Sequence, residues 1–381
     1  ILFVVSEVVP FSKTGGLADV AGALPKALRE LGHDVRLVTP RYRVVSPKRH
    51  RLKTIIPSLS VPVAGRTVDV SIREGRLPKT DVPVYFVDHA GLFDREGLYQ
   101  DGAGQDYEDN LERFSVFSQA ALHLAQTLGW APDILHAHDW QASLAVVHRK
   151  LTRAADPFWQ STATVLTVHN LAYQGTFPQA DWDLTTLPRH AFGIDGLEFY
   201  GRINCLKGGL VYADRLTTVS PTYAKEIQTP EFGCGLEGLL SRRRDVLTGI
   251  LNGIDVEEWD PKTSPHLAAH YSAEEPAGKA LCKLWLQEHQ GLPQRHGLLL
   301  GMVQRLVEQK GIDLFLKAAE DLFRLDIQVV LLGSGEPAYE HQLRALAARY
   351  PEQLAVSVAF DQALAHQIEA GSDAFLMPSR F

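Results

Sequence analysis

The chain has 381 residues and a formal net charge of −7 at pH 7, with 45% hydrophobic and 22% charged residues. This length exceeds one ordinary domain, and the composition is typical of a globular protein. The negative charge argues against nucleic acid as a partner, and no apolar run is long enough to predict a membrane span. The 3 cysteines lie far apart without C-x-x-C spacing, which predicts neither a disulfide framework nor a zinc framework.

The chain begins with an apolar strand, a glycine pair and an amphipathic helix. Ile1–Val5 is the predicted strand, and Pro25 inside the helix predicts a kink or a restart. Gly15 and Gly16 allow the backbone to approach a ligand closely. The helix N-terminus and Lys13 favour an anion there. The alternative is a tight turn with a solvated lysine.

Short apolar runs then alternate with helical patterns, which is typical of a parallel α/β fold. The predicted strands are residues 35–39, 59–63, 68–72, 82–87, 133–136, 162–168 and 216–219, with a surface loop over 94–110 and a helix over 111–128. Alternation at Val68, Val70 and Ile72 predicts antiparallel pairing with one wet face. A later helix is predicted to begin with Ser220 as its N-cap and Pro221 at its first position.

A turn at Asn252 predicts the boundary between two domains, residues 1–253 and 254–381. In the second domain the predicted strands are residues 298–303, 327–332, 354–358 and 374–377, and the predicted helices begin near Ile312 and span 339–350 and 362–370. These four strands are fewer than the five or six usual in a doubly wound sheet, so we expect the protein to continue past Phe381. The predicted fold is two doubly wound α/β domains that face each other across a cleft.

Polar residues that follow predicted strands are the first candidates for a site, because ligands bind beyond the carboxyl ends of parallel strands. These residues are Lys13, Asp139, His169, Arg305 and Lys310. Arg305 and Lys310 precede a helix, and two cations at that point suit a diphosphate. A solvated loop is the alternative. The next glycine turn, residues 333–336, either lines a nucleotide pocket or is an ordinary turn.

Two histidine motifs follow neighbouring predicted strands. His136 and His138 are two residues apart, so on a strand both side chains lie on one face. No cysteine or carboxylate pattern completes a zinc site, and we expect no metal. Taken alone, His169 is more often a structural residue than a functional one.

The motifs K-T-G-G-L-A-D-V, H-A-H-D-W, T-V-H-N, L-N-G-I-D, R-L-x-x-Q-K-G and F-L-M-P-S-R-F occur in this order along the chain. Together they resemble bacterial glycogen synthases and plant starch synthases, the GT5 family of retaining, two-domain GT-B glycosyltransferases. The resemblance implies an N-terminal glucan-binding catalytic domain over residues 1–253. It implies a nucleotide-sugar-binding domain over residues 254–381. It also implies transfer of glucose from ADP-glucose to the non-reducing end of an α-1,4-glucan, without a cofactor.

The same resemblance assigns roles to single residues. The implied catalytic residues are His169, Asp139, Arg305 and Lys310, and the implied ADP-glucose-binding residues are Lys13, Gly15, Gly16, Asp19, Asn252, Arg305 and Lys310. His169 would face the donor sugar, either through its imidazole or through its carbonyl near the anomeric carbon. The cations would stabilise the leaving diphosphate, so no covalent nucleophile is required. Glu7 and Tyr99 are further candidates near the sugars.

One departure and several alternatives stay open. Family members continue from S-R-F into an E-P-C-G-L segment whose glutamate belongs to the active site, and this sequence stops before it. We expect an intact enzyme that continues, whereas a chain ending there would be weakly active. The alternatives are a catalytically inactive glucan-binding homologue and a sister enzyme that uses UDP-sugars. We expect a cytoplasmic protein, or a plastid one if the source is a plant; the oligomeric state stays open.

Overall fold

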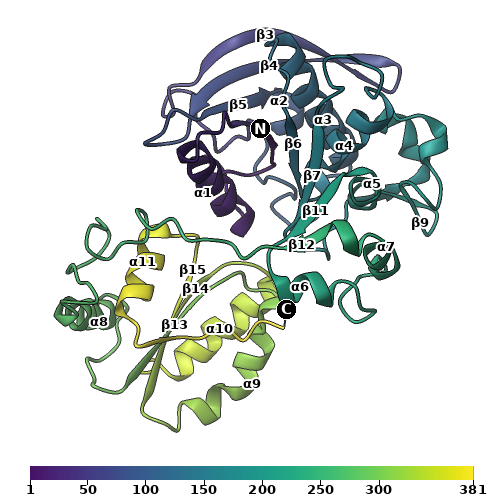
Figure 1. The fold of residues 1–381 in the computed structure, drawn as a ribbon. Coiled ribbons are helices and arrows are strands. Elements are labelled where there is room, and N and C mark those ends of the chain that lie inside the picture. Colours follow the sequence, from purple (N-terminus) through teal and green to yellow (C-terminus); the bar gives the residue numbers. More distant parts are fainter. Residues whose placement is uncertain (381) are drawn as a thin grey trace. The chain divides into compact units, whose positions relative to one another are not determined.

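The structure is a computed structural model that describes residues 1–380. The chain forms two compact units: Ile1–Gly253 and a second unit that begins at Ile254. Each unit has a largely or wholly parallel sheet of its own (Figure 1). Within the described residues, no helix has the length and apolar character needed to cross a membrane.

A nine-stranded sheet in the order β12-β11-β7-β6-β1-β2-β5-β4-β3 forms the core of the first unit. Its strands are β1 (Leu2–Val4), β2 (Arg36–Pro40), β3 (Lys53–Val63), β4 (Arg66–Arg76), β5 (Pro83–Asp88), β6 (Ile134–His138), β7 (Ala163–Val168), β11 (Arg215–Thr218) and β12 (Leu247–Gly249). Strand β4 pairs antiparallel with both β3 and β5, as the alternation predicted, and the other neighbours are parallel. The sequence did not predict β12, because three residues are too few for a pattern.

Helices and a small second sheet complete the first unit. The helices are α1 (Gly16–Glu30), α2 (Ala90–Phe93), α3 (Asn110–Thr127), α4 (Asp139–Leu151), α5 (Cys205–Tyr212), α6 (Pro221–Glu226) and α7 (Glu237–Arg242), and the small antiparallel sheet contains β8 (Thr176–Pro178), β9 (Glu198–Phe199) and β10 (Arg202–Asn204). The predicted N-cap is confirmed, because the Ser220 side chain accepts from the backbone N–H groups of Thr222 and Tyr223. Of the two alternatives predicted at Pro25, a kink or a restart of the helix, the restart is wrong, because α1 continues through that proline.

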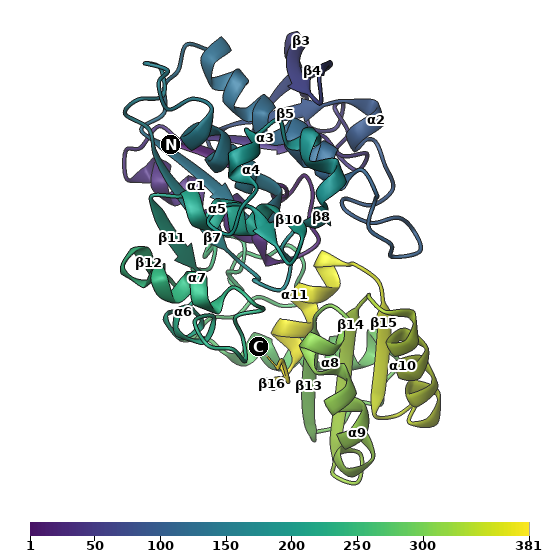
Figure 2. The ribbon, with the colours of Figure 1, turned by 90° about the vertical axis from the view of Figure 1, so that its right-hand side faces the viewer.

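A four-stranded parallel sheet in the order β15-β14-β13-β16 forms the core of the second unit (Figure 2). Its elements are α8 (Ala277–His289), β13 (Leu298–Val303), α9 (Ile312–Leu322), β14 (Ile327–Gly333), α10 (Pro337–Arg349), β15 (Leu354–Val358), α11 (Gln362–Gly371) and β16 (Ala374–Phe375). Val329 packs with α9 and α10, whereas its neighbour Val330 packs with α8 and α11. Helices therefore cover both faces, which makes the unit doubly wound. The sequence missed α8, which buries only Cys282, Leu286 and Gln287.

Candidate active site

The glycine turn between β1 and α1 is organised around the buried side chain of Glu7. The Thr14 hydroxyl donates to Glu7 Oε1 at 2.6 Å, and the Tyr99 hydroxyl donates to the same oxygen at 2.7 Å. The backbone N–H groups of Thr14 and Gly15 donate to Oε2. Burial raises the pKa of Glu7, and these hydrogen bonds oppose that rise. Two N–H groups of the predicted anion turn thus donate to a carboxyl group of the chain itself, and Glu7 holds the turn together.

Lys13 and the two glycines lie on the outer side of the same turn. Lys13 Nζ donates to Asp19 Oδ1 at 2.7 Å, and both side chains are partly exposed. A Cβ added to Gly15 or Gly16 would meet no atom of the described chain within 4 Å. Neither glycine has a positive φ. Neither packing nor backbone conformation therefore requires glycine at these two positions, and the space beside both is open.

Asp139 connects the ends of two neighbouring strands. It follows β6 as the first residue of α4, and its Oδ1 accepts from the backbone N–H of His169, after β7, at 2.7 Å. Its φ of 53° is left-handed, a conformation that non-glycine residues adopt mainly where the surroundings impose it. Burial raises the pKa of Asp139 to about 7, and backbone hydrogen bonds from His169 and Asn170 oppose the rise. The carboxyl group is thus held against the backbone of the T-V-H-N motif.

His169 is neutral and contacts a second histidine. Burial lowers the pKa of His169 to about 4. Its Nε2 lies 3.0 Å from Nδ1 of His138, the last residue of β6. The ring centroids of His138 and His136 are 4.3 Å apart, which confirms that both side chains lie on one face of the strand. The structure therefore brings Asp139 and His169 together, with His138 behind the imidazole.

Trp140 and Gly175 join the H-A-H-D-W motif to the segment after T-V-H-N. The Trp140 ring packs edge-on against Phe114, with the centroids 4.9 Å apart, and also packs against Phe177. Gly175 has a φ of 61°, and a Cβ there would lie 2.3 Å from Trp140 Cε3. Both the conformation and the close approach of the indole require glycine at this position.

In the second unit, Arg305 and Lys310 lie in the loop between β13 and α9. Burial lowers the pKa of Lys310, and the nearby positive charge of Arg305 lowers it further. The two cations are therefore close enough to repel each other. Gly311, with a φ of 70°, is the N-cap of α9, and a Cβ there would lie 2.1 Å from the carbonyl oxygen of Pro378. This glycine lets the loop that carries the cations turn directly into the helix.

The cationic loop is fastened to the next glycine turn. Leu306 N donates to the carbonyl of Ser334 at 3.0 Å, and Glu336 N donates to the carbonyl of Leu306 at 2.9 Å. On the other side, the Arg380 guanidinium donates to Asp313 Oδ2 at 2.6 Å. Main-chain hydrogen bonds thus fix the position of the loop that carries Arg305 and Lys310.

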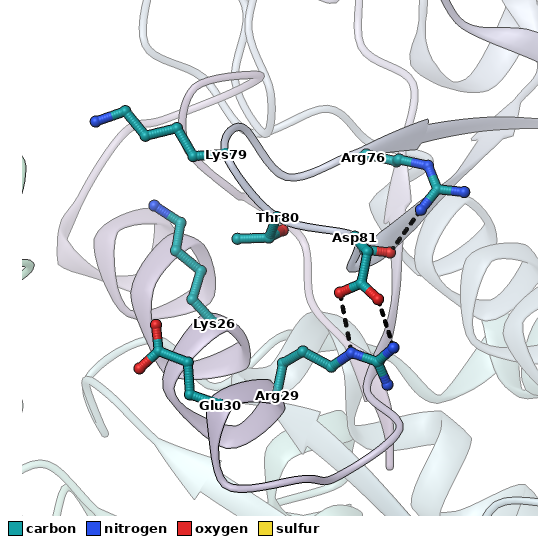
Figure 3. A pocket seen from close by; sticks show the side chains of 7 residues that line it. All are labelled: Lys26, Arg29, Glu30, Arg76, Lys79, Thr80 and Asp81. Carbon is teal, nitrogen blue, oxygen red and sulfur yellow. Dashed lines mark hydrogen bonds and ion pairs between the residues drawn. The ribbon is translucent and has the colours of Figure 1, made fainter.

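The remaining predicted site residue and a surface hollow complete the description. Asn252 is exposed at the end of the first unit. A hollow of about 540 Å³ on the first unit is lined by Lys26, Arg29, Glu30, Arg76, Lys79, Thr80 and Asp81 (Figure 3). Arg29 Nε donates to Asp81 Oδ1 at 2.9 Å, and Arg76 donates to the Asp81 carbonyl at 2.9 Å. No predicted site residue lines this hollow. Among the residues that the structure describes, no group of three or more His, Cys, Asp or Glu side chains is arranged to hold a metal ion.

Two parallel-sheet α/β units with functional motifs at the carboxyl ends of their strands define a glycosyltransferase of the two-domain GT-B class. Residues 1–242 match the family described as starch synthase catalytic domain, and residues 287–381 match glycosyl transferases group 1. The chain belongs to the glycogen synthase and starch synthase family, GT5.

Individual relatives support this assignment. The chain is 51% identical to the glycogen synthase of Anaeromyxobacter dehalogenans strain 2CP-C, over 100% of this chain and 79% of that protein. It is 47% identical to glycogen synthase 1 of Geobacter metallireducens, over 100% of this chain and 76% of that protein. The catalytic domain of starch synthase IV from Arabidopsis thaliana, bound to ADP and acarbose, is similar with a TM-score of 0.93 and 32% identity, over 100% of this chain and 78% of that one.

Proposed function

We propose that this glycosyltransferase transfers glucose from ADP-glucose to the non-reducing end of an α-1,4-glucan, with retention at the anomeric carbon. The observation that carries the proposal is the Arg305–Lys310 pair, held on a tethered loop in a chain of this family. Arg can bind two phosphate oxygens at once, and Lys supplies a point charge. A relative whose structure holds ADP and acarbose supports both proposed substrates.

The proposed division of labour follows the two units. Residues 1–253 bind the glucan and the transferred sugar, and residues 254–381 bind the nucleotide. The acceptor hydroxyl attacks the anomeric carbon on the face from which the diphosphate departs, and the departing diphosphate oxygen takes the hydroxyl proton. Arg305, Lys310 and Lys13 stabilise the negative charge that develops on the diphosphate, which is electrostatic catalysis. No covalent intermediate with the protein is required.

The contacts within the first unit support roles for its polar side chains. Lys13 uses one ammonium donor for Asp19, and an ammonium group has three, so two remain for phosphate oxygens. Asp19, Asp139 and His169 hold sugar hydroxyls, and Asn252 contributes from the end of the unit. The open space beside Gly15 and Gly16 lets the donor approach the backbone.

We further propose a cytoplasmic location. The Cys234 thiol is exposed and unpaired, while Cys205 and Cys282 are buried thiols. Free thiols suit a reducing compartment. A nucleotide sugar as the substrate points to the same compartment.

The test is turnover by the purified protein with ADP-glucose and glycogen, measured as ADP release and as lengthening of the glucan. We expect release that depends on glycogen and is faster with ADP-glucose than with UDP-glucose. The Lys310→Ala variant should lose at least about a hundredfold in kcat/KM, because a charge on the leaving group is no longer neutralised. Glucan binding without ADP release would support an inactive homologue, and faster turnover of UDP-glucose would support the sister enzyme.

A further inference from the structure

His138 lies in a stack of aromatic rings on the central strands of the first unit. The ring centroids of Phe3 and His138 are 4.9 Å apart, and those of His136 and His138 are 4.3 Å apart, with both pairs stacked. The His138 side chain is fully buried, and its Nδ1 lies 3.0 Å from His169 Nε2. The stack fixes the plane of the ring that touches His169, and this contact leaves only Nδ1 of His169 for a sugar.

The contact between the two rings holds one proton. Burial lowers the pKa of both His138 and His169, so both are neutral at pH 7. A neutral imidazole has one N–H group and one bare nitrogen. The proton in the contact therefore belongs either to Nδ1 of His138 or to Nε2 of His169, and this choice sets the tautomer of both rings.

The surroundings of His138 Nε2 decide between these two arrangements. This nitrogen is buried and has no hydrogen-bond partner among the residues that the structure describes. If His169 carried the shared proton, His138 would bury an unpaired Nε2–H group. Orphaned buried N–H groups are rarer than under-satisfied acceptors. The favoured arrangement thus has His138 protonated at Nδ1 and bare at Nε2.

We propose that His138 is a positioning residue that donates from Nδ1 to His169 Nε2, and thereby makes His169 present an Nδ1–H donor to a hydroxyl of the donor sugar. This inference rests on the proposed function, because it gives His169 a sugar-facing role. It adds a specific task for the second histidine of H-A-H-D-W. It also selects the imidazole, rather than the backbone carbonyl, as the group through which His169 acts.

The kinetic test compares substitutions at two stacked histidines of the same strand. His138→Phe keeps a ring in the stack and removes the donor, whereas His138→Asn keeps an amide donor near the position of Nδ1. His136→Phe is the matched control, because His136 Nε2 contacts the Thr167 hydroxyl at 2.7 Å instead of His169. We expect His138→Phe to lower kcat about tenfold, His138→Asn to recover most of it, and His136→Phe to leave kcat within about twofold.

A double-substitution cycle separates positioning from a general structural effect. In a His169→Ala background, His138→Phe should cause no further loss of kcat, since its only route to the sugar is gone. Equal losses from His136→Phe and His138→Phe would overturn the proposal. A further tenfold loss in the His169→Ala background would do the same.

A spectroscopic test needs no turnover and no variant of His138. Long-range ¹H–¹⁵N spectra of histidine-labelled protein report which ring nitrogen is protonated, and His169→Ala identifies the His169 signals. We expect His169 to be protonated at Nδ1 and bare at Nε2; protonation at Nε2 would overturn the proposal. With the expected tautomer but no ADP release, the positioning contact would stand and the proposed function would fail.

Discussion

Asp139→Asn tests whether burial or hydrogen bonding controls the charge of the proposed sugar-binding carboxylate. Asparagine is nearly isosteric, and its side-chain oxygen can still accept from the backbone N–H of His169. A pKa raised from 3.8 to about 7 means that the free energy of unfolding is about 4 kcal/mol lower when Asp139 is ionised than when it is protonated. The substitution removes this cost and retains the backbone hydrogen bond.

The sign of the pH dependence follows from the raised pKa. The folded state binds the proton more tightly than the unfolded state, so wild-type stability falls as pH rises from 3.8 towards 7 and is level above 7. Asp139→Asn lacks this dependence. As the pH rises from 5 to 8, the free energy of unfolding of the variant should therefore increase by about 3 kcal/mol relative to that of the wild type. Turnover should fall because the carboxylate is lost.

The assay is urea unfolding of both proteins at several pH values, followed by tryptophan fluorescence, for which the adjacent Trp140 is a local probe. Taking the difference between the two proteins at each pH cancels the titration of all other groups. A difference that stays constant from pH 5 to pH 8 would refute the reasoning. It would mean that the N–H groups of His169 and Asn170 offset the burial of the charge.

Three further substitutions test the site. Lys13→Ala should lower kcat/KM for ADP-glucose at least about tenfold. It should change the free energy of unfolding by less than about 0.5 kcal/mol, because the ion pair of Lys13 with Asp19 is partly exposed; a large stability loss would make Lys13 a structural residue. Glu7→Ala should lower the free energy of unfolding, measured with urea, by about 3 kcal/mol, because four donors lose their acceptor. A loss below about 1 kcal/mol would contradict the role of Glu7 in holding the turn. Gly175→Ala should lower the free energy of unfolding by at least about 2 kcal/mol, because its Cβ would overlap with the Trp140 ring. A variant as stable as the wild type, with unchanged Trp140 fluorescence, would show that this close contact does not require glycine.

The contrast between Lys13 and Glu7 shows how one short turn separates two tasks. Glu7 binds the turn from inside with a carboxylate, and Lys13 lies on the outer side with its ammonium partly exposed. The predicted binding of an external anion at this turn stays a prediction. Two of its N–H groups, those of Thr14 and Gly15, already donate to the Glu7 carboxyl group of the chain itself.

The sequence by itself determined most of the elements and the family. Parallel strands covered on both faces are continuous apolar runs, and helix starts depend on local chemistry such as the Ser220 cap, so both can be identified without tertiary contacts. Two of the elements that the sequence did not predict, β12 and α8, bury too few side chains to produce a pattern. The six motifs identified the family because each preserves residue types at fixed spacing along the chain.

Only the tertiary structure decided which groups meet at the candidate site. His138 and His169 are 31 residues apart, and Glu7 and Tyr99 are 92 apart. These contacts depend on the order of the strands in the sheet and on the path of the loops that follow them. Protonation follows from the same contacts, since burial and hydrogen bonds set the charge on Asp139 and His169. Sequence spacing reveals residue types, whereas proximity and burial, which set their chemistry, appear only once the chain is folded.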